Sequence, residues 1–296
     1  MISEHAVVLG DHHAYTASVR SLKAVAGVPV RFPTIRPVYE AFDDQVREQR
    51  FAMSELAIVA FLQGRDAGKP LLLVPIVLAG GFGHKNLYAT PAKQFGSPAE
   101  LVGGRIGVRS YSQTTALWVR AWLDEEYDVT ADSVTWVVTE RSHSDGYDDP
   151  DNVELIEGSL TNELVSGGID AAILGARYAP GGVGPMLPDF AQRDAQWYKR
   201  HGLVPVNHLL TTTEAFYAEY PEVVHGVFEH LARAIPKSDP GVAGGAGHPA
   251  GLPAAVRSGF DQVRPAVELA TRYAYDQHLI SAPVEDVDEL FAFGES

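Results

Sequence analysis

The sequence predicts an α/β fold, and two observations lead to this prediction. Short apolar runs alternate with amphipathic stretches of helical spacing, a pattern typical of strands that alternate with helices. With 296 residues, 46% of them hydrophobic, the chain can also bury the core of two domains or of one large α/β domain. Seven runs are predicted to be strands: residues 5–9, 28–32, 71–77, 105–109, 134–138, 170–174 and 204–210.

Four amphipathic stretches are predicted to be helices: residues 113–127, 160–165, 214–235 and 265–279. The first has apolar residues at i, i+1, i+4 and i+5, which form one helix face. Gly167 follows the second stretch, where glycine favours a helix C-terminus, and Pro236 ends the third. Pro265 is expected in the first turn of the fourth, since proline fits that position.

Two segments interrupt this alternation. Residues 139–163 contain eight acidic residues and one basic residue, and their order does not match a calcium-binding loop, so a solvated loop is expected. Residues 236–255 are rich in proline, glycine and alanine. This composition predicts a poorly ordered loop or a lid over a cleft.

The composition excludes several classes of protein. The net charge of −15 argues against partners such as nucleic acids and anionic membranes. The absence of cysteine removes disulfides, thiolate nucleophiles and cysteine-ligated metals. No apolar run is long enough to span a membrane, and the first residues lack the features of a signal peptide. We therefore expect a cytoplasmic protein, and whether it forms a homo-oligomer stays open.

A turn rich in hydroxyl groups lies between the predicted strand at 105–109 and the predicted helix at 113–127. It contains Tyr111, Ser112, Thr114 and Thr115. Free N–H groups at a helix start, together with such hydroxyls, form a seat for a carboxylate. An ordinary helix N-cap is the alternative, because serine and threonine are favoured there in any case.

Histidines and an aspartate follow or lie within other predicted strands. Asp11, His12 and His13 follow the first strand, where ligands of open α/β sheets commonly bind, although a solvated polar turn is the alternative. His84 follows a glycine-containing turn, and His208 lies inside an apolar run where a core role is common. Imidazole suits proton transfer because it titrates near neutral pH.

The run GGRIGVRSYSQTTALWVRAWLDEEYDV, residues 103–129, resembles the 4,5-dihydroxyphthalate decarboxylase family. Four further segments resemble that family in the same order: FAMSELAIVAFL, PIVLAGGFGHKNLY, GLVPVNHLL and RYAYDQHLISAPVEDVDELF. The resemblance covers most of the chain.

The resemblance implies a type II periplasmic-binding-protein-like fold, in which two α/β lobes are joined by two crossover strands and the ligand lies in the cleft between them. Lobe one would contain residues 1–88 and 208–296, and lobe two residues 89–207. The implied site residues are Asp11, His12, Ser54, Glu55, His84, Tyr111, Ser112, Thr114, Thr115, Arg177 and His208.

The chain departs from the family before its histidine. The family is rich in arginine there, whereas residues 80–83 of this chain are Gly-Gly-Phe-Gly. The family also has an arginine after the aspartate of its first loop, where this chain has His12. Because arginine recognises carboxylates through two parallel hydrogen bonds, a small monoacidic or neutral substrate is expected here in place of a dicarboxylate.

The resemblance implies a decarboxylase without a cofactor, or a related lyase, whose partner is a small hydroxylated aromatic or similarly conjugated carboxylic acid. His84 and His208 would transfer protons, and Asp11 would orient a histidine or act as a base. The turn at 112–115 and Arg177 would hold the carboxylate.

Two alternatives remain open from the sequence. The first is a non-catalytic solute-binding or sensor protein of the same fold, because a fold does not determine function. The second is a metal-dependent lyase or hydrolase in which His12 or His13, His84, His208 and an acidic residue bind zinc or iron.

Overall fold

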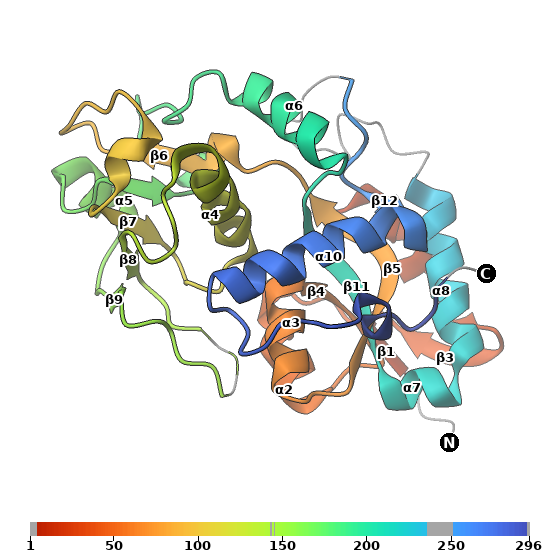
Figure 1. Ribbon diagram of the computed structural model, residues 1–296. Helices are drawn as coiled ribbons and strands as arrows, with labels where there is room; N and C mark the ends of the chain where they lie inside the picture. Colours follow the sequence, from red (N-terminus) through yellow and green to blue (C-terminus); the bar gives the residue numbers. More distant parts are fainter. Residues whose placement is uncertain (1–4, 143, 145, 236–250, 295–296) are drawn as a thin grey trace.

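The computed structural model describes residues 5–142, 144, 146–235 and 251–294. Figure 1 shows two groups of strands side by side, one drawn at the left and one at the right, with helices packed against both. Helix α10 (Phe260–Asp276) crosses the front of the right-hand group and contacts α3 (Ile58–Asp66) and α4 (Thr114–Tyr127). The architecture is therefore mixed α/β with two sheets.

The larger sheet has seven strands in the order β12-β5-β11-β4-β1-β3-β2. The strands are β1 (His5–Val8), β2 (Ala24–Val25), β3 (Val28–Arg31), β4 (Met53–Ala57), β5 (Leu71–Gly80), β11 (Val206–Thr213) and β12 (Arg257–Ser258). Strand β4 is parallel to β1 and antiparallel to β11, so it lies between an early and a late segment of the chain.

The smaller sheet has five strands in the order β6-β10-β7-β8-β9. They are β6 (Leu87–Ala89), β7 (Arg105–Val108), β8 (Thr135–Val138), β9 (Val153–Leu155) and β10 (Ala171–Ile173). Strand β7 is parallel to β8 and β10, as expected for strands joined by helical crossovers.

The chain passes between the two sheets twice, once from β5 to β6 and once from β10 to β11. This confirms the predicted two-lobed fold class with two crossovers. The lobe boundaries at 88/89 and 207/208 stay a prediction.

The other helices flank these sheets: α1 (Ala17–Arg20), α2 (Phe42–Glu48), α5 (Leu160–Ser166), α6 (Phe190–His201), α7 (Glu214–Glu219) and α8 (Pro221–Ala234). The largest apolar core contains residues of both sheets, such as Leu56 and Ile106, together with Trp118 and Trp122 of α4. A second core lies under α8, where Val223 and Val227 pack with residues of β1 and β5. The shared core holds the two sheets against each other.

Each of the seven predicted strands overlaps an observed strand. The short strands β2, β6, β9 and β12 and the buried strand β4 are not among those seven runs. Strand β4 is buried on both faces and continues directly into α3, so its sequence shows no alternation of apolar and polar residues.

The predicted helices are confirmed with two corrections. The helix predicted over 214–235 is divided into α7 and α8 at Tyr220, because Pro221 starts a new helix at its first position. Pro265 lies inside α10, which begins five residues earlier at Phe260, and not in the first turn of a helix. The first-turn prediction was therefore wrong, although the helix itself is present.

The two predicted irregular segments have different outcomes. Residues 139–163 include β9 and the start of α5, so the prediction of a loop holds for the described residues before Val153 and for residues 156–159. Most of the segment predicted as a loop or lid, residues 236–250, lies outside the described residues. In the described part of the chain, no helix is both long and apolar enough to cross a membrane.

Candidate active site

A cavity of about 470 Å³ lies between segments that belong to the two sheets. One wall comes from α2, from the 3₁₀ turn before it and from the start of α3. The other comes from the turn between β7 and α4, and the start of β11 lies beside both. The lining residues are Tyr39, Glu40, Phe42, Asp43, Val46, Ala57, Ala60, Gln63, Arg109, Ser110, Ser112, Gln113, Thr114, Thr115, Glu140, Ser144, Asn207 and His208.

The β7–α4 turn supplies hydroxyl groups and a helix N-terminus to this cavity. Ser112, Thr114 and Thr115, which the sequence assigned to a carboxylate seat, line it, and the binding of a carboxylate there stays a prediction. The Oγ atoms of Ser110 and Ser112 lie 3.1 Å apart, and Thr114 Oγ1 accepts the Val59 N–H at 3.4 Å. These contacts fix the turn against the start of α3.

Tyr111 belongs to the same turn but does not line the cavity. Its ring is buried, and its hydroxyl donates to the Gln277 carbonyl at 2.9 Å. The Arg120 guanidinium lies 4.1 Å from the centre of the ring. The structure therefore places Tyr111 in the core that joins α4 to α10, and its predicted contact with a substrate stays untested.

The pairing of β4 and β11 brings Glu55 to His208. In the antiparallel register His208 faces Ala57 and Leu210 faces Glu55, so all four side chains share one face of the sheet. A register shift between β11 and β5 also occurs at His208. His208 Nδ1 lies 2.7 Å from Glu55 Oε1, and His208 is also part of the cavity wall.

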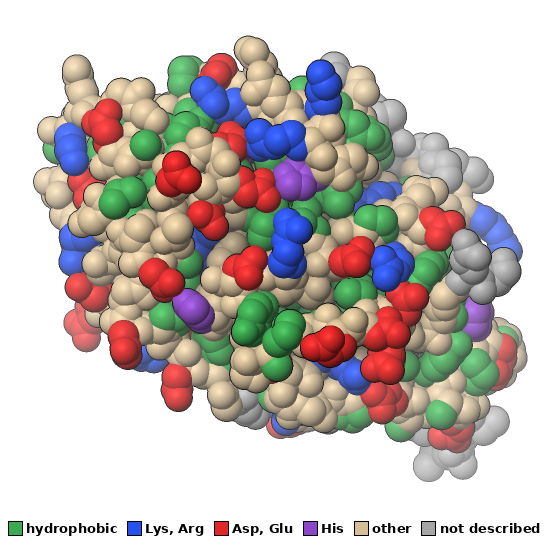
Figure 2. All heavy atoms as spheres, in the orientation of Figure 1, with side chains coloured by type: hydrophobic (Ala, Val, Ile, Leu, Met, Phe, Trp, Pro, Cys, Tyr) green, Lys and Arg blue, Asp and Glu red, His purple; other side chains and the backbone are tan. Residues whose placement is uncertain are grey.

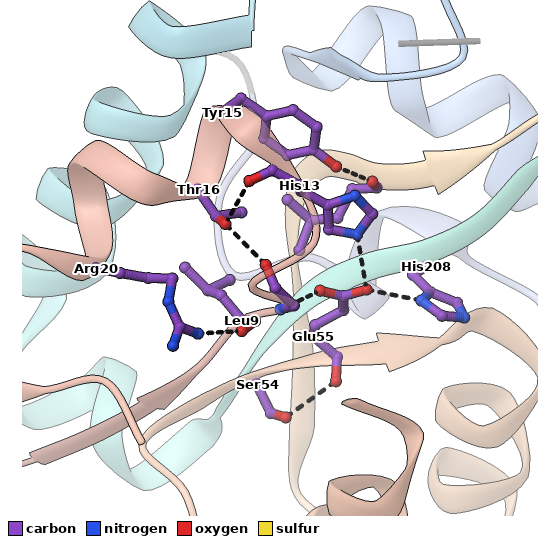
Figure 3. Close-up of polar contacts among 10 residues, drawn as sticks. Leu9, His13, Tyr15, Thr16, Arg20, Ser54, Glu55 and His208 are labelled. Atoms are coloured by element: carbon purple, nitrogen blue, oxygen red, sulfur yellow. Dashed lines mark hydrogen bonds and ion pairs between the residues drawn. The ribbon is translucent and has the colours of Figure 1, made fainter. Parts of the chain in front are cut away.

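Glu55 is fully buried, and two further groups bind its carboxylate (Figure 3). The Gly10 N–H donates to Oε2 at 2.8 Å, and His13 Nε2 lies 3.4 Å from Oε1. Burial raises the pKa of the Glu55 carboxyl, but hydrogen bonds from His13 and His208 outweigh burial and hold the pKa well below its ordinary value. Glu55 is therefore a buried anion held by donors.

The loop after β1 positions these donors. Thr16 Oγ1 donates to the carbonyls of Gly10 and His13, at 2.7 and 2.9 Å. The His12 and His13 rings lie 3.8 Å apart, and burial, followed by the neighbouring His13, lowers the pKa of His12. A side chain at Gly10 would meet His12 Cε1 at 2.8 Å and Glu55 Oε2 at 3.0 Å, so glycine permits this close approach.

Asp11 faces a different partner from the one predicted. It forms an ion pair with Arg36, whose Nε donates to Asp11 Oδ2 at 2.5 Å. The hydrogen bond from Arg36 lowers the pKa of Asp11. Glu55, and not Asp11, is the carboxylate that the structure places against a cavity histidine.

His84 is buried away from the lining of the cavity. Its Nδ1 lies 2.6 Å from Asp194 Oδ1, its Nε2 lies 3.5 Å from Glu126 Oε1, and its ring stacks on Trp122 at 4.7 Å. Burial lowers the pKa of His84, but hydrogen bonds to Asp194 and Glu126 outweigh it and raise the pKa. The structure does not bring His84 and His208 together, and the catalytic role of His84 stays a prediction.

Two other predicted binding residues also lie apart from the cavity lining. Ser54 is buried on the face of β4 opposite to Glu55, where its Oγ donates to the Glu55 carbonyl at 2.9 Å. Arg177 is exposed, and its guanidinium lies 4.6 Å from the ring centre of Tyr178. Among the described residues, no hydrogen bond joins either side chain to the hydroxyl-rich turn.

The ligand set of the metal alternative is not assembled, because His84 lies with Asp194 and not with the other histidines. Among the described residues, no group of three or more histidine, aspartate or glutamate side chains is arranged to hold a metal ion.

Sequence reasoning assigned no role to several polar residues that the structure places along the cavity. Arg109, Gln113 and Asn207 line it, and His13 lies behind it on Glu55. Arg109 is paired with Glu140 at 3.6 Å and stacks on Tyr39 at 5.1 Å. His13 was weighed together with His12, but only the loop geometry shows which of the two rings reaches Glu55.

The chain is similar in sequence to two curated proteins named 4,5-dihydroxyphthalate decarboxylase. The protein from Comamonas testosteroni is 31% identical over 205 residues, which cover 62% of this chain and 60% of the relative. The protein from Pseudomonas putida is 30% identical over 127 residues, 43% of this chain and 47% of the relative. These similarities confirm the resemblance seen in the sequence, over about half to three fifths of each relative. No protein family model matches the chain.

Solved structures with the same fold include binding proteins and an enzyme. The alkanesulfonate-binding protein SsuA from Xanthomonas axonopodis pv. citri, bound to MOPS, has a TM-score of 0.56 at 13% identity and 94% coverage of both chains. SsuA from Escherichia coli has a TM-score of 0.58 at 12% identity, with 98% of both chains covered. A mutant of DSZB in complex with biphenyl-2-sulfinic acid has a TM-score of 0.61 at 16% identity, with 99% of this chain and 97% of that chain covered. The periplasmic-binding-protein-like fold is thereby confirmed.

Proposed function

We propose that this chain is a cofactor-independent decarboxylase, or a closely related carbon–carbon lyase, that acts on a small hydroxylated aromatic or similarly conjugated carboxylic acid. The observation that carries the proposal is His208, which lies in the wall of the cavity with its Nδ1 bound to the buried Glu55. The similarity to two proteins named 4,5-dihydroxyphthalate decarboxylase supports the same reaction class.

The hydroxyl-rich turn is the proposed seat of the substrate carboxylate. Ser112 and Thr115 present hydroxyls to the cavity, and the first turn of α4 adds backbone N–H groups that have no partner within the helix. Arg109 provides a positive charge in the same wall, although Glu140 already pairs with it. A carboxylate held here would lie across the cavity from α2.

Glu55 determines which ring nitrogen of His208 carries the proton. An ionised carboxylate only accepts hydrogen bonds, so the neutral His208 ring directs its Nδ1–H to Glu55 and keeps a lone pair on Nε2. Among the described residues, Nε2 has no hydrogen-bond partner. His208 is therefore suited to accept a proton from a substrate, and the resulting imidazolium would be stabilised by the Glu55 charge.

The proposed reaction balances with one proton consumed in each turnover. His208 Nε2 takes the proton of a phenolic hydroxyl, and the same nitrogen then delivers it to the ring carbon that bears the carboxylate. The bond between that carbon and the carboxylate breaks, carbon dioxide leaves, and the electron pair restores the aromatic ring. The phenolate formed in this way takes a proton from water.

The charges around the cavity favour a substrate with one carboxylate. Glu40, Asp43 and Glu140 line the cavity, against one arginine, Arg109. A second carboxylate would add a further negative charge to this set and would lack a second arginine to bind it. A monocarboxylate with phenolic donors agrees better with these walls.

The test is to incubate the full chain with a panel of hydroxylated aromatic acids labelled with ¹³C in the carboxyl group, and to measure labelled carbon dioxide. We expect release that is lost in His208→Gln and retained in His230→Gln, a change of an exposed histidine on α8. Full turnover by His208→Gln on an accepted acid would contradict the proposed mechanism.

A non-catalytic binding or sensor protein is the second candidate, and the hydroxyl-lined cavity would serve that function equally well. Isothermal titration with the same acids separates the two. Binding without any release of carbon dioxide by the wild-type chain would favour the sensor and exclude the decarboxylase for that panel.

A further inference from the structure

We propose that His13 is a positioning residue, which holds Glu55 from a second direction and thereby lowers the proton affinity of His208. Figure 3 shows both rings converging on the Glu55 carboxylate, His13 from the loop after β1 and His208 from β11. The inference rests on the proposed function in one respect, because His208 acts on a substrate only in the proposed decarboxylase mechanism.

The two carboxylate oxygens of Glu55 accept hydrogen bonds from three donors. Oε2 receives the Gly10 N–H at 2.8 Å, while Oε1 faces His208 Nδ1 at 2.7 Å and His13 Nε2 at 3.4 Å. Since an ionised carboxylate has no proton to give, each ring presents an N–H to it. The buried carboxylate therefore fixes a proton on Nδ1 of His208 and on Nε2 of His13.

Two donors on one oxygen compete for the same negative charge. When His13 donates, part of the charge of Glu55 is compensated, and the remaining attraction for an extra proton on His208 is weaker. Without the His13 donor, Glu55 would act on His208 alone and would stabilise its imidazolium form more strongly. His13 thus helps His208 to release its proton to the substrate carbon.

His13 is held in this place by its own neighbours. Its ring stacks on the Tyr15 ring at 5.0 Å and 19°, and the Tyr15 hydroxyl donates to the Leu78 carbonyl. Thr16 Oγ1 binds the His13 carbonyl at 2.9 Å. The His13 side chain is only 14% exposed. A ring fixed on both its face and its backbone meets Glu55 without a further loss of conformational freedom.

The other charged groups around His208 are placed differently. His12 lies beside His13, but its ring forms no hydrogen bond to Glu55 among the described residues. The other charged side chains that line the cavity together with His208 are Glu40, Asp43, Arg109 and Glu140. In the described part of the chain, His13 is thus the only side chain besides His208 that is hydrogen-bonded to the Glu55 carboxylate.

The test compares two variants of the full chain. His13→Phe keeps a planar ring against Tyr15 but has no donor, whereas His13→Gln keeps an N–H donor without an imidazole. The titration of His208 is followed by NMR of its ¹³C-labelled imidazole, identified by its loss in His208→Gln. We expect His13→Phe to move the His208 midpoint upward by about half a pH unit or more, and His13→Gln to reverse most of that shift.

A second readout distinguishes positioning from folding. In His13→Phe, the pH profile of kcat should move by the same amount as the His208 midpoint, while KM changes little. His230→Gln should leave the pH profile and the His208 midpoint unchanged. A His208 midpoint in folded His13→Phe equal to that of the wild type would overturn the inference. If His13→Phe does not fold, His13→Asn is used, because its shorter amide ends before Glu55, and an unchanged midpoint in that variant overturns the inference equally.

The NMR result does not depend on turnover. A shifted His208 midpoint in a chain that releases no carbon dioxide from any acid would support the role of His13 and contradict the proposed function. If the wild type releases carbon dioxide but the His208 midpoint in His13→Phe is unshifted, the proposed function is supported and the role of His13 is contradicted.

Discussion

His84 Nδ1 lies 2.6 Å from Asp194 Oδ1, and both side chains are about 1% exposed. Hydrogen bonds to Asp194 and Glu126 outweigh the effect of burial and raise the pKa of His84 above its ordinary value of 6.5. A group with a raised folded-state pKa contributes stability below its unfolded pKa, and this contribution is lost as the pH rises through the folded-state pKa.

We therefore expect the free energy of unfolding to fall as the pH rises above about 6.5, with a contribution from this one proton of up to about 1.4 kcal/mol per pH unit. The measurement is denaturant unfolding between pH 5.5 and 8.5. The double variant His84→Gln/Asp194→Asn should lack this part of the slope, since neither remaining group titrates. An equal slope in the double variant and the wild type would contradict this assignment.

Replacement of Glu55 by glutamine should lower kcat by about 10²-fold or more, because the amide neither fixes the His208 tautomer nor stabilises its imidazolium. KM should change less, since Glu55 is behind the histidine and does not line the cavity. Steady-state release of carbon dioxide measures both constants. Glu214→Gln, a carboxylate paired with Arg65 on the surface, is the matched control. A kcat near that of the wild type would remove Glu55 from the mechanism.

Gly10→Ala should destabilise the chain by about 1–3 kcal/mol, because the new methyl group would overlap the packed His12 and His13 rings. It should also disturb the Gly10 N–H bond to Glu55 and reduce turnover. Thermal and denaturant unfolding test the first effect. Gly184→Ala is the control, since a Cβ there meets nothing within 4 Å. Equal stability of the two variants would show that the Gly10 contact is not tight.

A monocarboxylate should be a better substrate than its dicarboxylate analogue by about tenfold or more in kcat/KM, which corresponds to about 1.4 kcal/mol. The acidic lining at Glu40 and Asp43 is the cause. The comparison of 3,4-dihydroxybenzoate with 4,5-dihydroxyphthalate measures this ratio. The double variant Glu40→Gln/Asp43→Asn should reduce this ratio of kcat/KM values. A preference of the wild type for the dicarboxylate would refute the charge argument.

Turnover should survive removal of metal ions, because the proposed steps use only histidine, carboxylate and hydroxyl groups. The rate is measured after dialysis of untagged protein against a chelator, with elemental analysis of the same sample. Loss of activity that returns on addition of a divalent metal would revive the metal-dependent alternative.

The site could be predicted in part from the sequence. The turn with Ser112, Thr114 and Thr115 follows from a strand, a hydroxyl-rich turn and a helix that are adjacent in the chain, so local pattern was sufficient. His208 was a candidate from its place in a predicted strand, and Glu55 was identified only through the family resemblance. Their contact depends on the register of two strands separated by about 150 residues, and no local pattern encodes that register.

Other residues show the limit of local reasoning. Asp11, His12 and His13 are neighbours in sequence, yet Asp11 pairs with Arg36 while His13 reaches Glu55. His84 and His208 both follow or lie in apolar strands, yet one is enclosed by Asp194 and Glu126 and the other lines the cavity. These differences arise from side-chain direction and from helices packed on top, which are properties of the tertiary fold.

The sequence alone determined the α/β class, seven strand positions and the chemistry available to a protein without cysteine. Hydrophobic periodicity reports which face of a segment is buried, and that is a local property. The tertiary structure decided which carboxylate meets which histidine. Strand β4 places Glu55 between the loop after β1 and strand β11. A buried carboxylate needs hydrogen-bond donors, and these come from segments that are distant in sequence and that only the fold brings together.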